Sequence, residues 1–156
     1  GGHYQVVVVG MGNIGTLVYE KLQSLVKVKS FDIQNDHPER LSALLAEADI
    51  LTVHIPLTDT NRAFFDKEKL NVLKDDAAIV NTARGALFDE RDLYEILLRS
   101  NRRAAFDVFW EEPYKGVLSS LPKEKFLMTP HTASTTREFV EAGFNDIITM
   151  SQETVR

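Results

Sequence analysis

The chain of 156 residues contains no cysteine, which excludes disulfides, thiolate catalysis and zinc sites with cysteine ligands. A chain without cysteine suits a reducing compartment, and we expect a cytoplasmic protein. No apolar run approaches the roughly 18 residues that a membrane span needs, and Gly1-Gly2-His3 shows no secretory signal. We therefore expect no association with membranes.

The sequence also lacks a large excess of charge of either sign. The 18 Lys and Arg residues against 23 Asp and Glu give a net charge of −5, and no basic stripe is present, so nucleic acid is not an expected partner. No spacing of His, Asp and Glu resembles a metal site, and G-x-S-x-G is absent. Without repeats or a Pro/Ser/Gly-rich linker, this length predicts one domain.

Short apolar strands alternate with amphipathic helices along the whole chain. We predict strands at residues 6–9, 28–32, 50–55, 77–81, 104–109 and 126–129. Helices are expected after residue 13, at 37–48, at 66–73, after Asp89 and at 136–150. This alternation predicts an α/β fold, a Rossmann-type doubly wound parallel sheet in a three-layer α/β/α arrangement with right-handed crossovers.

Within these helices, the apolar and charged positions carry further expectations. The first helix carries apolar residues at helical spacing, namely Ile14, Leu17, Val18, Leu22 and Leu25. Asp66 and Asp89 are expected N-caps of the third and fourth helices. The basic cluster of Arg99, Arg102 and Arg103 is interpreted as a solvated helix C-terminus, where the helix dipole favours cations.

A glycine-rich turn follows the first predicted strand. Residues 10–15 read Gly10-Met11-Gly12-Asn13-Ile14-Gly15, a G-x-G-x-x-G that opens a helix. Gly10 allows the tight turn, Gly12 lets the backbone approach a pyrophosphate, and Gly15 allows the helix to pack closely on the strand. The free N–H groups at the helix N-terminus favour phosphate, so the turn predicts dinucleotide binding.

An acid ends the second predicted strand, 22 positions after Gly10. Asp32 stands where a carboxylate accepts hydrogen bonds from the adenosine ribose, and it would repel a 2′-phosphate. Ile33, Gln34 and Asn35 supply no nearby cation. The sequence therefore favours NAD over NADP as the cofactor.

Four ordered motifs follow, and with the glycine turn they resemble a known family. They are residues 48–58 (ADILTVHIPLT), 81–85 (NTARG), 107–113 (DVFWEEP) and 129–131 (TPH). The chain is identified as similar, over nearly its whole length, to the cofactor domain of the D-isomer-specific 2-hydroxyacid dehydrogenases. That family includes phosphoglycerate, glycerate and D-lactate dehydrogenases, with formate dehydrogenase and a corepressor branch as relatives.

The resemblance implies a catalytic trio. Arg84 matches the arginine that grips the substrate carboxylate, a task that suits a bidentate guanidinium. His131 matches the acid/base that exchanges a proton with the C2 oxygen, and Glu112 matches the carboxylate that hydrogen-bonds this histidine. Each of the three follows an apolar strand, on the side where open α/β sheets bind ligands. Small 2-hydroxy or 2-oxo acids are the implied substrates.

The resemblance also implies further cofactor contacts. Asp107 matches an acid near the nicotinamide carboxamide, and the backbone around Ala83 and Ala133 would line the same ring. His54, Pro56 and Thr58 resemble the wall beside the adenosine half. Asn13 and Ile14 belong to the glycine turn itself.

The family's substrate domain is built from the two ends of a longer chain, so we expect residues 1–156 to be the NAD-binding domain without a substrate domain, inactive alone. A homodimer through this domain is the expected assembly. An NAD-sensing module of the corepressor type remains an alternative, whereas formate dehydrogenase is disfavoured because that branch carries Gln at Glu112. Only 15 residues separate Asp32 from Ala48. This segment is shorter than in the family, whose sheet usually has seven strands. We therefore expect one strand or a segment of a helix to be missing.

Overall fold

A computed structural model describes residues 3–130 of the chain, and in them six parallel strands form one sheet. The strand order is β2-β1-β3-β4-β5-β6. The strands are β1 (Gln5–Val9), β2 (Lys27–Phe31), β3 (Ile50–Val53), β4 (Ala78–Asn81), β5 (Arg103–Phe106) and β6 (Phe126–Met128). All six were predicted from the apolar pattern; β2 and β6 end one residue earlier than expected, β3 two residues earlier and β5 three residues earlier.

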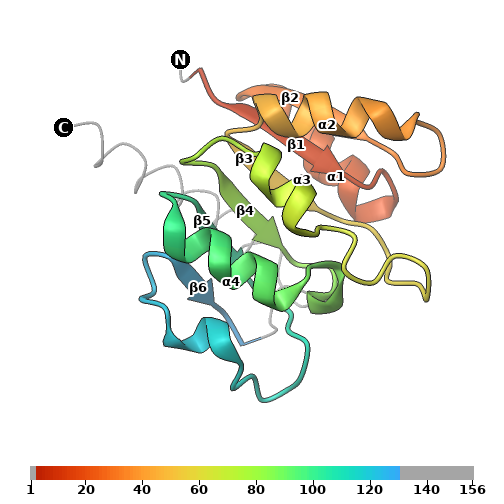
Figure 1. Cartoon of the computed structure of the whole chain (residues 1–156). Helices are drawn as coiled ribbons and strands as arrows, with labels where there is room; N and C mark the ends of the chain where they lie inside the picture. Colours follow the sequence, from red (N-terminus) through yellow and green to blue (C-terminus); the bar gives the residue numbers. More distant parts are fainter. Residues whose placement is uncertain (1–2, 131–156) are drawn as a thin grey trace.

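The helices of the described residues cover both faces of this sheet. They are α1 (Asn13–Leu22), α2 (Pro38–Glu47), α3 (Lys67–Val72) and α4 (Glu90–Arg99), with short 3-10 turns η1 (Gly85–Leu87) and η2 (Val117–Ser120). Figure 1 shows α2, α3 and α4 side by side on one face, with α1 on the other. The predicted helix at 136–150 lies outside the described residues.

Alternate residues of β1 contribute to two separate cores. Val7 and Val9 of β1 are buried in the core under α2, α3 and α4, whereas Val6 and Val8 are buried in a smaller core under α1. Side chains of a strand alternate between its faces, so a run of valines is what a strand covered on both faces requires. These two cores confirm the Rossmann-type α/β/α fold.

The predicted caps of two helices are present. The Asp66 carboxylate accepts a hydrogen bond from the Lys69 backbone N–H at 3.1 Å, and Asp89 does the same for Asp92 at 2.9 Å. Each bond satisfies a backbone donor that the first turn of a helix leaves free. Neither helix therefore offers an uncapped N-terminus to a ligand.

The first helix turns a different face to the sheet than its apolar residues suggest. Val18 is buried, but Ile14 is 63% exposed, Leu17 57% and Leu25 74%. Gly15 decides this orientation because a Cβ there would collide with the Gly10 carbonyl. α1 packs closely at Gly15, and Val18, on the same face of the helix, points toward the sheet.

The short connection after β2 contains only α2. Between Asp32 and β3 the chain forms a turn and one helix, so within residues 3–130 β2 pairs with β1 alone and ends the sheet. No helix in the same range combines the length and the apolar character that crossing a membrane requires.

Candidate functional site

The parallel register brings the predicted site residues to one edge of the sheet. Val9 pairs with Phe31 and with Val53, Val53 pairs with Asn81, and Asn81 pairs with Phe106. The residues that follow these strand ends are therefore neighbours along the carboxyl edge, and they include Gly10, Asp32, His54 and Asp107. The strand order also reverses at β1, and open α/β sheets bind ligands in the crevice at such a point.

The glycine turn sits at this reversal. Gly10 has φ +101°, which side-chain-bearing residues rarely adopt, and its N–H donates to the Phe31 carbonyl at 2.8 Å. A Cβ at Gly15 would strike the Gly10 carbonyl. Both glycines are thus required by the packing of the chain on itself, whatever binds there.

Gly12 differs from these two glycines. It precedes α1 with φ −76°, which any residue adopts, and a Cβ placed on it would meet no atom of residues 3–130 within 4 Å. It is the N-cap of α1, yet no side chain caps this helix and its first turn has no acid. The start of α1, with Asn13 and Ile14, therefore offers free N–H groups and partial positive charge to open space.

Asp32 stands at the next strand end and is half-buried in a tight turn. Its carboxylate accepts hydrogen bonds from the Gln34 backbone N–H at 3.0 Å and from the Asn35 amide at 2.5 Å. A carboxylate has about four lone-pair sites, so two bonds leave it able to accept ribose hydroxyls. The turn fixes the orientation of the group and keeps it at the sheet edge.

His54 lies between the glycine turn and the wall predicted for the adenosine half. Its ring Nε2 is 2.8 Å from the hydroxyl of Thr52, and burial lowers the pKa of the imidazole to about 4. His54 is therefore neutral near pH 7. Pro56 and Thr58 follow on an exposed loop, in which the Thr58 N–H donates to the Asn61 side chain at 2.7 Å.

A buried asparagine shapes the turn that carries Arg84. The Asn81 side chain donates to the Arg84 carbonyl at 2.9 Å and accepts from the Ala83 N–H at 3.0 Å. The Arg84 side chain is exposed, and it donates to the Ala83 carbonyl at 2.6 Å. No site role was predicted for Asn81, although a polar residue at the end of a buried strand was the signal.

Asp107 is buried at the end of β5, with 2% of its surface exposed. Its carboxylate accepts a hydrogen bond from the Thr129 hydroxyl at 2.5 Å. The turn bearing Arg84 packs against the same segment, because a Cβ on Gly85 would collide with the Phe109 backbone. Glu112 is exposed on the loop beyond, while His131 and Ala133 lie outside the described residues.

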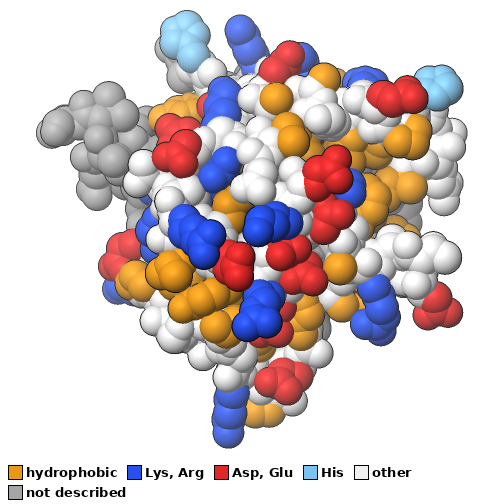
Figure 2. Space-filling view, viewed as in Figure 1, with side chains coloured by type: hydrophobic (Ala, Val, Ile, Leu, Met, Phe, Trp, Pro, Cys, Tyr) orange, Lys and Arg blue, Asp and Glu red, His pale blue; other side chains and the backbone are white. Residues whose placement is uncertain are grey.

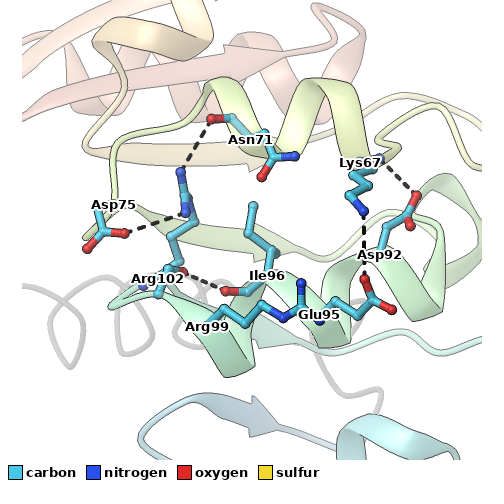
Figure 3. A pocket seen from close by; sticks show the side chains of 9 residues that line it. Lys67, Asn71, Asp75, Asp92, Glu95, Ile96, Arg99 and Arg102 are labelled. Carbon is cyan, nitrogen blue, oxygen red and sulfur yellow. Dashed lines mark hydrogen bonds and ion pairs between the residues drawn. The ribbon is translucent and has the colours of Figure 1, made fainter.

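A hollow of about 210 Å³ lies between α3 and α4 (Figure 3). Arg102 lines it and is 8% exposed, which corrects the prediction that the basic cluster is solvated. Its guanidinium donates to the carbonyls of Leu73 and Asn71 at the end of α3, and it lies 3.8 Å from Asp75. Arg102 therefore closes the C-terminus of α3, and the hollow is separate from the predicted site.

The face that bears α2, α3 and α4 carries no large patch of charge of a single sign. Figure 2 shows basic and acidic side chains interspersed over this face. Among residues 3–130, no group of three or more His, Asp or Glu side chains is arranged to hold a metal ion. The carboxyl edge presents a helix start without a side-chain cap, an acid at the end of β2 and an exposed arginine.

Comparison with known proteins gives the same assignment for most of the chain. The family described as "D-isomer specific 2-hydroxyacid dehydrogenase, NAD binding domain" matches residues 2–133. The D-3-phosphoglycerate dehydrogenase of Methanocaldococcus jannaschii is 34% identical over 148 residues, which cover 87% of this chain and 28% of that protein.

Solved structures share the fold. The NAD-dependent formate dehydrogenase of Staphylococcus aureus in complex with NAD is 30% identical with a TM-score of 0.75, covering 94% of this chain and 47% of that one. A probable 2-hydroxyacid dehydrogenase of Rhizobium etli in complex with NADP is 27% identical with a TM-score of 0.75, covering 87% and 48%. The chain thus spans under half the length of these three proteins.

Proposed function

Because the chain belongs to the NAD-binding domains of the D-isomer specific 2-hydroxyacid dehydrogenases, we propose that it forms the cofactor half of such an enzyme. In this proposal the cofactor lies along the carboxyl edge of the sheet. The enzyme would move a hydride between NAD and C2 of a small D-2-hydroxy or 2-oxo acid.

The observation that carries the proposal is Gly12. Gly10 and Gly15 are explained by internal packing, but Gly12 has an ordinary backbone conformation and open space where a side chain would be. Neither backbone strain nor a steric contact with residues 3–130 requires a glycine there. A ligand that approaches the backbone closely does require one, and at the start of an uncapped helix the fitting ligand group is a phosphate.

Two neighbouring features support the same ligand. The N-termini of α3 and α4 are capped by aspartates, whereas α1 has neither a side-chain cap nor an acid in its first turn. An anion there meets unsatisfied N–H donors without repulsion from the helix itself. Asp32, on the strand next to β1, supplies the acceptor that a ribose diol needs.

The reacting end of the proposed site depends on Arg84, Glu112 and His131. When bound, the nicotinamide ring supplies the hydride acceptor or donor. Arg84 projects from the turn that Asn81 holds, and no acidic side chain within residues 3–130 pairs with it, so its guanidinium is available for a substrate carboxylate. His131 would take the hydroxyl proton as the hydride leaves, and Glu112 would stabilise the imidazolium. The roles of His131 and Glu112 rest on the sequence match.

The test is a titration with NADH that follows energy transfer from Trp110, the single tryptophan. We expect saturable transfer with the wild-type chain. Gly12→Ala should weaken NADH binding by about tenfold or more, because a methyl group displaces the phosphates from the helix start. Ser24→Ala, in the exposed loop after α1, is the control and should leave binding unchanged.

Two outcomes would overturn the proposal. One is an absence of energy transfer at high NADH concentration. The other is unaltered NADH affinity in Gly12→Ala, measured on a variant whose melting temperature matches that of the wild type. Because Gly12 has no internal contact for a Cβ to disturb, the variant is expected to fold normally.

A further inference from the structure

The turn after β2 is closed by a second aspartate. The Asp32 carbonyl accepts a hydrogen bond from the Asp36 N–H at 2.8 Å, and the Asp36 carboxylate accepts one from the Asp32 N–H at 2.7 Å. The two residues therefore bond each other reciprocally across residues 32–36. Asp36 fixes the backbone from which the Asp32 carboxylate projects.

The same Asp36 carboxylate holds an arginine. Its other oxygen accepts a hydrogen bond from Arg40 Nη1 at 2.7 Å, in an i,i+4 ion pair. The backbone bond to Asp32, ahead of the charge and hydrogen bond of Arg40, lowers the pKa of Asp36, so this carboxylate is charged at neutral pH. Arg40 is the only Lys or Arg between residues 31 and 40, and both members of the pair reach solvent.

Residues 33–35 supply no cation, as the sequence indicated, and the structure brings one from further along the chain. Arg40 on α2 is joined to the Asp32 backbone through the single carboxylate of Asp36. Glu39, on the same turn of α2, is exposed and bonded to neither residue. The Arg40 guanidinium, a group able to bind a phosphate, is thus connected to the Asp32 turn, but it is paired with the Asp36 carboxylate.

We propose that Asp36 is a second determinant of cofactor preference, which holds the Asp32 turn in position for a ribose diol and keeps Arg40 from a 2′-phosphate. The inference rests on the proposed function, because it assumes that the adenosine ribose lies at Asp32. A 2′-phosphate brings negative charge that two aspartates repel, and it needs a cation with free donors. Arg40 meets that need once Asp36 no longer carries a charge.

The proposal separates the two acids by role. Asp32 would act directly on the ribose, so its removal weakens NADH binding. Asp36 would act through Asp32 and Arg40, and Asp36→Asn leaves an amide oxygen that can still accept the Asp32 N–H. The turn is therefore expected to persist in Asp36→Asn while the guanidinium of Arg40 is released.

The experiment measures NADH and NADPH affinities of the wild type, Asp36→Asn, Asp36→Asn/Arg40→Ala and Asp75→Asn by energy transfer from Trp110. The last variant removes one exposed acid at the opposite edge of the sheet and controls for net charge. Asp36→Asn should raise NADPH affinity relative to NADH by about tenfold, the effect of one charged hydrogen bond. The double variant should lose this gain, and Asp75→Asn should not show it.

An unchanged NADPH/NADH ratio in Asp36→Asn, with NADH still bound, would overturn this inference and leave the proposed function intact. An equal gain in the double variant or in Asp75→Asn would also overturn it, because the effect would then not pass through Arg40. A wild-type chain that binds neither nucleotide overturns the proposed function, and this inference with it.

Discussion

The carbonyl oxygen of His54 occupies the space that a side chain at Gly10 would need. A Cβ on Gly10 would lie 2.5 Å from that oxygen, which belongs to a backbone segment held by the hydrogen bond from the His54 N–H to the Val9 carbonyl at 2.7 Å. The end of β3 thus fixes the path of the chain as it leaves β1. The phosphate-type turn is held by the sheet and does not depend on a ligand for its shape.

Gly10→Ala is therefore expected to destabilise the fold. The positive φ alone costs about 1–2 kcal/mol for an L-residue, and the collision with His54 adds to it, so we expect a loss of at least about 2 kcal/mol in the free energy of unfolding. Urea unfolding followed by Trp110 fluorescence measures this loss. Gly12→Ala is the matched control and should change stability by less than about 0.5 kcal/mol. Equal effects of the two substitutions would contradict this account of the turn.

His54 predicts a pH dependence of stability. Burial lowers its pKa to about 4 from the ordinary value of 6.5. Between these two values His54 is largely protonated in the unfolded chain and largely neutral in the folded chain. The contribution of the neutral imidazole is complete above pH 6.5 and is lost as the pH falls towards 4. The loss is at most about 3 kcal/mol.

The measurement is the difference in unfolding free energy between the wild type and His54→Gln at several pH values from 7 to 4. Carboxylates that titrate in this range are common to both proteins and cancel in the difference. The variant should lose less stability than the wild type as the pH falls. Parallel curves would show that the imidazole accepts a proton freely in the folded state.

Ala63 adopts a conformation that glycine prefers. Its φ is +52°, and its N–H donates to the Ala86 carbonyl at 2.8 Å, which ties the exposed loop after Pro56 to the turn beyond Arg84. Ala63→Gly removes the strain but adds chain entropy to the unfolded state, so we expect a net gain of about 0.5–1 kcal/mol. Ala86→Gly, at a residue with ordinary φ, should lose a similar amount. A loss in thermal stability for Ala63→Gly would contradict the interpretation that the backbone at Ala63 is strained.

Replacing Arg102 is expected to lower the stability of the fold, at a place remote from the predicted cofactor site. Its guanidinium binds carbonyls at the end of α3, and burial lowers its pKa while Asp75 and Asp76 raise it. Arg102→Met keeps much of the aliphatic stem and removes these bonds, so we expect a loss of about 1–3 kcal/mol. Arg99→Met, on an exposed neighbour, should stay within about 0.5 kcal/mol. NADH affinity should not change in either variant, and a wild-type melting temperature for Arg102→Met would refute the capping role.

Apolar periodicity and capping residues were enough to predict the strands and helices of the described chain. They did not predict which face of α1 is buried, because Ile14 and Leu17 are as regularly spaced as Val18. The deciding residue is Gly15, which has no side chain to count as apolar and yet lets the helix touch the strand. Apolar periodicity detects side chains that become buried, whereas α1 contacts the strand because Gly15 has no side chain.

The site shows a similar division. Glycines and acids at strand ends are visible in the sequence, and the register gathers them at one edge. The residues that hold them in place were missed. No site role was predicted for Asn81, Thr52, Asp36 or Arg40, because the role of each depends on hydrogen bonds that only the folded chain forms. Arg102 was missed for the same reason.

The short connection from Asp32 to Ala48 also determines how the sheet meets its surroundings. Among residues 3–130, β2 is an outer strand, and an outer strand presents unpaired backbone groups that can recruit a strand from another molecule. Lys27 and Lys29 are exposed along β2, and Lys29 is bonded to Glu47 of α2. Charged side chains on an edge disfavour such recruitment. Pairing of two copies of this domain through β2, edge to edge, is therefore expected to be disfavoured.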